Sequence, residues 1–162
     1  MTHDKRQEGW HVPHRLRQLR PAVAASLETA NTQSWAVVDP DLLELARLRV
    51  AGMIGSTQGR ARRSAAARAA GLAEDKIAAL AQWPSDPRFT HREQDCLAFV
   101  EQYVMDVAGM SDEQVAVAER HFDGGGFRDF VTALYITEVT LRLELAGDAL
   151  LQPADSPMEA SA

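Results

Sequence analysis

The fold is decided by the stretch from Leu42 to Leu72, which reads LLELARLRVAGMIGSTQGRARRSAAARAAGL. Apolar residues recur at helical spacing in its first half, at Leu42, Leu45, Ala46, Val50 and Met53. This spacing predicts a helix that turns an apolar face toward a core. Glu44 and Arg47, three residues apart, are expected on the other side of that helix.

A corner follows this helix. The sequence GSTQG at 55–59 contains two glycines and small polar residues, which are typical of a break between helices. The arginines and the alanine run beyond it favour a second helix from about 60 to 70, and Gly71 suits its end. Ser56 or Thr57 is the expected N-cap of that helix.

This unit resembles the core motif of the alkylhydroperoxidase D-like, carboxymuconolactone decarboxylase family. The resemblance continues through IAALAQW, FTHRE, LAFVEQY and MSDEQV, so that it covers about residues 40–150. It implies an alkylhydroperoxidase D-like helical bundle that forms oligomers. The helical patterns, with no competing strand signal, likewise predict an all-α architecture of about six or seven helices.

The chain departs from the redox members of this family, which carry a glutamate, a C-x-x-C pair and a histidine. Glu44 falls on the glutamate position, but Ser56 and Gly59 stand in the cysteine positions and Arg63 in the histidine position. A serine hydroxyl cannot pass through sulfenic acid or a disulfide, and glycine has no side chain to do so. The dithiol peroxidase route is therefore excluded, and the resemblance bears on the fold more than on the activity.

The resemblance makes Glu44 the first candidate catalytic residue, because the redox members use this glutamate in a proton relay. Its carboxylate would act as a general acid or base beside the corner. The alternative is a glutamate on the helix surface, paired with Arg47. Ser56 is the second catalytic candidate, but no histidine in the motif would activate it, and the N-cap is its alternative role.

Substrate-binding candidates follow the corner. Arg60 and Arg63 lie three apart on one helical face and would clamp a carboxylate or a phosphate. Gln58 and the backbone amides of the corner would add hydrogen bonds to the same anion. The alternative is a solvated basic face. No metal or redox cofactor is expected.

Cys96 and Glu138 are two further residues with side chains capable of catalysis. Cys96 is the sole cysteine of the chain, so no intrachain disulfide can form, and its place in an apolar helical stripe predicts a buried, inert thiol. Glu138 lies in the most apolar helix and is spaced to pair with Arg142 at i+4. The alternative role for Glu138 is that of an acid lining a pocket.

Composition sets the wider limits. With 162 residues, 46% of them hydrophobic and 25% charged, the chain suits one globular domain. We expect a flexible N-terminus at 1–12, a helical domain at 13–151 and a disordered tail at 152–162. The net charge of -6 argues against a nucleic-acid partner. No apolar run suits a membrane span and the N-terminus has no signal-peptide core, so a cytoplasmic protein without a membrane partner is expected.

The last expected helix, at about 127–150, is apolar around its whole circumference. A helix of this kind is buried on all sides. In a chain of this length a second subunit would supply part of the cover. The sequence therefore predicts a homo-oligomer, as a dimer, trimer or hexamer.

Three functions are compatible with these residues. The first is a cofactor-free acid/base enzyme of lyase, decarboxylase or isomerase type, acting on a small anionic metabolite with Glu44 as the proton-transfer group. For this enzyme, Glu44→Gln is expected to abolish activity and leave the fold intact. The second is a non-catalytic, oligomeric ligand-binding relative of the alkylhydroperoxidases. The third is a peroxidase that works through Cys96.

Overall fold

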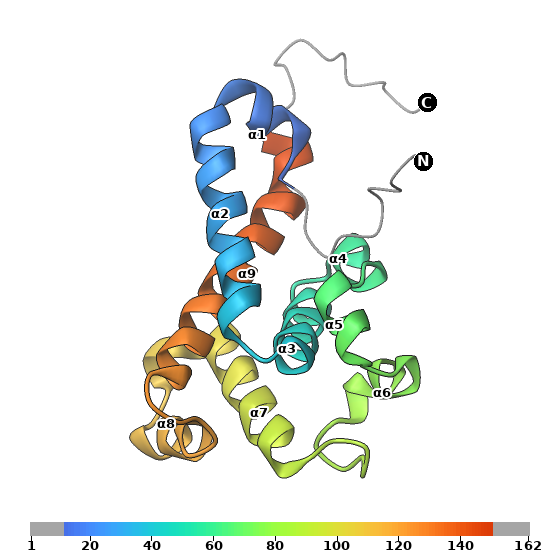
Figure 1. Ribbon diagram of the computed structural model, residues 1–162, viewed down its shortest axis with the longest axis vertical. Coiled ribbons are helices and arrows are strands. Elements are labelled where there is room, and N and C mark those ends of the chain that lie inside the picture. The colour runs from blue at the N-terminus through green and yellow to red at the C-terminus, as the bar shows by residue number, and fades with distance from the viewer. Residues whose placement is uncertain (1–11, 151–162) are drawn as a thin grey trace, which may run out of the picture.

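The computed structural model describes residues 12–150, and every regular element in this range is helical (Figure 1). The all-α prediction is thereby confirmed for the described part of the chain. The expected tail at 152–162 and all but Val12 of the expected flexible N-terminus lie outside it. The elements run as α1 (His14–Leu19), α2 (Pro21–Val37), α3 (Pro40–Met53), α4 (Thr57–Ala61), α5 (Ala65–Ala70), α6 (Glu74–Ala78), η2 (Leu80–Gln82), α7 (His91–Asp106), η3 (Val107–Gly109), α8 (Asp112–Glu119) and α9 (Gly126–Leu150).

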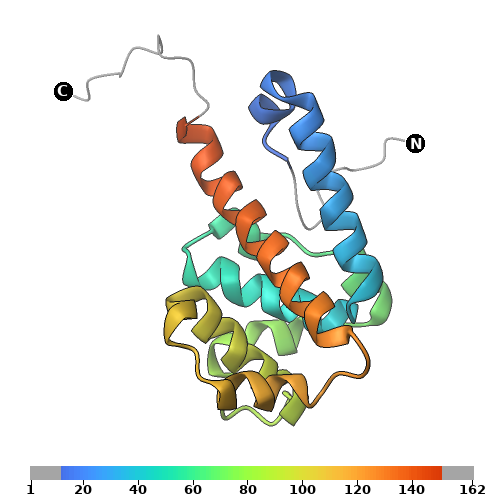
Figure 2. The ribbon, with the colours of Figure 1, turned by 90° about the vertical axis from the view of Figure 1, so that its left-hand side faces the viewer.

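Two long helices form an arm, and the shorter ones gather beside its base. Helix α2 packs along α9, and α1 contacts both at the far end of the arm (Figures 1 and 2). Helix α3 lies at the centre of the other part, where it contacts α4, α5, α7 and α9. The corner between α3 and α4 is therefore held against the middle of the molecule.

Helix α3 begins and ends at positions that the sequence marks. The Asp39 side chain accepts hydrogen bonds from the amides of Asp41 and Leu42, so Asp39 is the N-cap and Pro40 is the first residue of the helix. At the other end Gly55 has a φ of 77°, and the amides of Gly55 and Ser56 donate back to carbonyls of the last turn. This is the Schellman arrangement that a glycine permits.

Helix α3 is buried around most of its circumference, which corrects the expectation of one apolar face. One side belongs to a core cluster with α7 and α9, and the opposite side packs on a second cluster around Trp83 and Leu97. Glu44 and Arg47, expected on the outer side, are 0% and 2% exposed. Their charges therefore have to be neutralised inside the protein.

The single helix expected at about 60–70 is divided into α4 and α5. Arg62 and Ser64 between them have extended backbone, with ψ of 154° and 138°. The Arg62 carbonyl accepts a hydrogen bond from Arg47, and the Ser64 amide donates one to Glu44. These bonds to buried charges replace the helical ladder at the break, and Ser64 caps α5.

Two local predictions are confirmed: Ser56 caps α4, and Gly71 ends α5 with a φ of 95°. Thr90 and Ser111 form capping boxes at the starts of α7 and α8. Helix α2 runs to Val37. Its packing on α9 extends the helix through a stretch of weak helix formers.

Helix α9 is buried on one face and partly exposed on the other. Phe130, Leu134 and Leu141 are buried, whereas Tyr135 and Leu145 are 55% and 44% exposed. Burial on all sides is thus not achieved within one chain. None of the helices at 12–150 combines the length and apolar character needed to cross a membrane.

Gly59 provides a test of this packing. An added Cβ at Gly59 would lie 2.8 Å from Leu141 Cδ2 and 2.8 Å from Ser56 Oγ, so α4 meets α9 with no room for a side chain. We expect Gly59→Ala to lower the free energy of unfolding by about 1–3 kcal/mol, the usual cost of overpacking. Chemical denaturation measures the change. Gly125→Ala is the control, since a Cβ there meets nothing within 4 Å; equal stability of the two variants would contradict the packing.

Candidate functional site

Glu44 and Arg47 form a buried ion pair on one side of α3. Arg47 Nε donates to Glu44 Oε2 at 2.7 Å, and Arg47 Nη2 donates to Glu44 Oε1 at 2.9 Å. The two side chains are 1% and 3% exposed. The sequence alternative of a Glu44–Arg47 pair is confirmed, but its surface location is wrong.

The same two side chains hold the backbone of the corner. Arg47 Nη1 donates to the Gly59 carbonyl at 2.7 Å and Nη2 to the Arg62 carbonyl at 2.8 Å, while the Ser64 amide donates to Glu44 Oε1 at 2.9 Å. One buried pair thus ties α3 to the end of α4 and the start of α5. Removing one partner of such a pair typically costs about 3–5 kcal/mol, because the other charge is left without compensation.

Ser56 and Gly59, at the corner between α3 and α4, have structural contacts. Ser56 is 1% exposed and its Oγ accepts a hydrogen bond from the Gly59 amide at 3.0 Å. The predicted N-cap is therefore confirmed, and the hydroxyl is shielded from solvent. Gly59 lies so close to Leu141 that a cysteine side chain would require the surrounding atoms to move.

Gln58 takes part in a second set of polar contacts, which connects the corner to α9. Arg62 forms an ion pair with Glu144 of α9, and Arg62 Nη2 donates to Gln58 Oε1 at 3.2 Å. Burial, together with the nearby charge of Arg47, lowers the pKa of Arg62. Gln58 thus contacts a cationic side chain of the protein.

A cavity of about 450 Å³ opens beside the corner, between α3, α4, α6 and η2. Its charged lining residues are Arg49, Arg60 and Arg63, and no acidic side chain from residues 12–150 lines it. Apolar side chains of α3, α6 and η2, including Leu48, Ile77 and Leu80, form the walls. We call this space the arginine cavity. It has the size and mixed lining of a small-molecule site.

The structure thus separates the residues grouped by the sequence analysis. Arg60 and Arg63 line the arginine cavity, whereas Glu44, Ser56 and Gln58 do not. Glu44 instead borders a void of about 10 Å³, too small for an organic ligand. Arg49 could not be recognised as a cavity residue from the sequence, because only the fold brings the end of α3 opposite α6.

Two of the cavity arginines already have carboxylate partners. Arg49 Nε donates to Glu101 Oε1 at 2.6 Å, and Arg63 Nε donates to Glu74 Oε1 at 2.9 Å. Within residues 12–150 the guanidinium of Arg60 makes no hydrogen bond or ion pair, and it is exposed at the cavity. The expected Arg60–Arg63 clamp is therefore unequal, with one partnered and one unpartnered cation.

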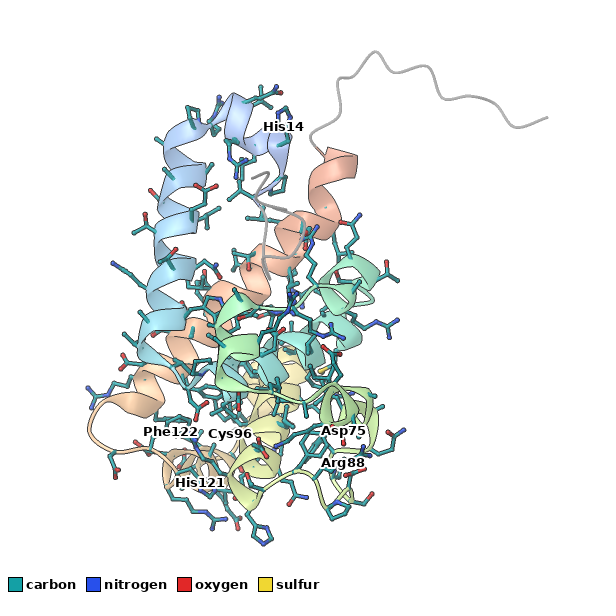
Figure 3. All side chains as sticks on the ribbon, turned by 45° about the vertical axis from the view of Figure 1, so that its right-hand side comes forward. His14, Asp75, Arg88, Cys96, His121 and Phe122 are labelled. Atoms are coloured by element: carbon teal, nitrogen blue, oxygen red, sulfur yellow. The ribbon has the colours of Figure 1, made fainter. Side chains whose placement is uncertain are left out.

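Cys96 lies inside the part of the molecule formed by α7 and its neighbours, as Figure 3 shows. It is 0% exposed, and burial raises the pKa of its thiol to about 12.

Asp95, the residue before Cys96, connects α7 to the segment that follows α8. His121 Nε2 lies 2.7 Å from Asp95 Oδ2. Burial raises the pKa of Asp95, but hydrogen bonds from His121 and Arg120 outweigh it and leave this pKa below its ordinary value.

Other charged contacts are structural. Glu138 and Arg142 pair at 2.8 Å along α9, as predicted, with the arginine side chain 54% exposed. Asp75 and Arg88 lie side by side near η2 (Figure 3). Between Val12 and Leu150 no group of three or more His, Cys, Asp or Glu side chains is arranged to hold a metal ion.

Comparison of the chain with models of protein families and with curated proteins finds no match in either. The geometry of the corner and of the arginine cavity is therefore the basis on which a function is proposed.

The buried pair predicts a stability effect for Glu44. We expect Glu44→Gln to lower the free energy of unfolding by about 3–5 kcal/mol, because Arg47 keeps its charge and loses its counter-ion. From the sequence alone, Glu44→Gln was expected to leave the fold intact, so the buried pair changes this expectation. Urea denaturation gives the value. The same substitution at Glu138, whose partner is exposed, should cost about 0.5 kcal/mol or less; a similarly small loss at Glu44 would contradict the role of the pair.

Burial of Cys96 predicts that its thiol is inert. A native protein with a shielded thiol of high pKa should not react with a thiol-specific disulfide reagent or form sulfenic acid with peroxide, since the thiolate is the reactive form. In denaturant one thiol per chain should react. Mass spectrometry after each treatment measures this. Rapid labelling of the folded protein would show that the thiol is accessible.

Proposed function

We propose that this chain binds a small organic anion in the arginine cavity and that it has no dithiol peroxidase activity. The observation that carries the proposal is the lining of the cavity: three guanidinium groups, no carboxylate and an apolar wall. Guanidinium groups bind carboxylates and phosphates through charge-assisted hydrogen bonds. An apolar wall beside them favours an organic anion over a bare inorganic one.

The position of Glu44 favours binding over acid/base catalysis at this residue. Both carboxylate oxygens accept hydrogen bonds from Arg47, and one also accepts from the Ser64 amide. A general base needs to reach the proton of a bound substrate, and Glu44 does not line the arginine cavity. The cofactor-free enzyme is therefore the weaker of the two functions considered for this site.

The proposal includes the resemblance to the carboxymuconolactone decarboxylase family. An all-helical chain with a helix–corner–helix unit at 40–70 is compatible with an alkylhydroperoxidase D-like bundle. We also propose a homo-oligomer. Exposed apolar side chains on the two arm helices support it: Val23 and Val37 on α2, and Tyr135 and Leu145 on α9.

Anilinonaphthalene sulfonate, a fluorescent monoanion with an apolar ring system, tests the proposed binding. We expect the folded protein to bind this dye in the arginine cavity. Arg60→Gln should weaken binding by about tenfold, because a hydrogen bond to a charged group is lost. Gly52→Leu should block the cavity. Gly52 lines the cavity. A Cβ at this position would meet only Arg60 Cδ, at 3.9 Å, so helix α3 should tolerate the change.

Arg142→Gln is the matched control, because Arg142 is an exposed arginine on α9 outside the cavity. Dye titration should give the same affinity for this variant as for the unmodified chain. Absence of dye binding, or equal affinity in Gly52→Leu and the unmodified chain, would contradict the proposed site.

A further inference from the structure

We infer that the ligand of the arginine cavity is a monoanion with an apolar body, and that Arg60 is the residue that binds its charge. The inference rests on the proposed binding function and adds the charge and the shape of the ligand. It follows from the way in which the three cavity arginines are already partnered.

Arg49 is held on the α7 side of the cavity. Its Nε donates to Glu101 Oε1 at 2.6 Å, and the same oxygen accepts from Trp83 Nε1 at 2.6 Å. Glu101 and Arg49 are both mostly buried, with side chains 22% and 27% exposed. The pair therefore contributes no net charge to the cavity, and breaking it would also disturb the indole contact.

Arg63 is neutralised in a similar way by a more exposed partner. Its Nε contacts both carboxylate oxygens of Glu74, at 2.9 and 3.2 Å, and its Nη2 donates to Glu74 Oε2 at 3.1 Å. Arg63 Nη1 is directed to the carbonyls of Arg60 and Arg62. The Glu74 side chain is 67% exposed, so its replacement should leave the core intact.

Arg60 alone among the three lacks a hydrogen-bond or ion-pair partner in the described part of the chain. One positive charge is therefore left uncompensated in the cavity. A monoanion neutralises that charge, whereas the second charge of a dianion would meet arginines that already hold carboxylates. Leu48, Ile77 and Leu80 offer the hydrocarbon part of the ligand an apolar wall.

Three probes of similar length separate these ligand classes. Isothermal titration of the full chain with octanoate, suberate and octanamide compares a monoanion, a dianion and a neutral molecule. We expect octanoate to bind at least about tenfold more tightly than either of the others. Arg60→Gln should remove the preference for octanoate over octanamide.

Glu74→Gln supplies the decisive variant, because it frees Arg63 and gives the cavity a second uncompensated charge. Its affinity for suberate should rise by about tenfold or more, until suberate binds at least as well as octanoate. Glu28→Gln is the control. It makes the same change in net charge at an exposed ion pair on α2, away from the cavity, and should leave the preference for octanoate unchanged.

The outcomes distinguish a failure of the proposed binding function from a failure of the monoanion inference. If neither octanoate nor the dye binds, the binding function itself is overturned. If octanoate binds through Arg60 but suberate binds the unmodified chain equally well, the binding function stands and the monoanion inference is overturned. An unchanged suberate affinity in Glu74→Gln also overturns the inference. It would show that the Glu74 carboxylate is not what prevents Arg63 from binding a second anionic group.

Discussion

The rest of the structure depends on the charge of Arg47 inside the protein, where water cannot solvate it. Glu44 supplies the counter-charge, and the carbonyls of Gly59 and Arg62 accept the remaining hydrogen bonds. Because buried charges are costly unless they are paired and hydrogen-bonded, these contacts determine where the chain turns. They divide what would have been one helix into α4 and α5, and in doing so they place Arg60 and Arg63 on the wall of a cavity.

Features encoded by neighbouring residues could be predicted from the sequence. The caps at Ser56, Thr90 and Ser111 depend on side chains within three residues of the bond they make, and the helical class follows from periodicity. The break between α4 and α5 could not be predicted, because Arg47 and Glu44 act on it from 15 and 20 positions away. Arg49 was missed for the same reason, since only the fold brings α6 opposite it.

Ser56 and Gly59 have structural roles at the corner between α3 and α4. Here the serine caps a helix, and the glycine lies against Leu141 without room for a side chain. The arginines that line the cavity lie beside this corner. Arg60 and Arg63 line the cavity, whereas Glu44 is buried in its pair with Arg47.

The amide of Ser64 gives the most direct measurement of the central claim. Ser64 lies between α4 and α5, and its amide donates a hydrogen bond to the Glu44 side chain. Native-state hydrogen exchange should show it protected to nearly the same free energy as the core amides of α3, because only disruption of the buried pair would release it. Exchange at the rate of an exposed loop amide would contradict the account, since Glu44 would then not hold the corner.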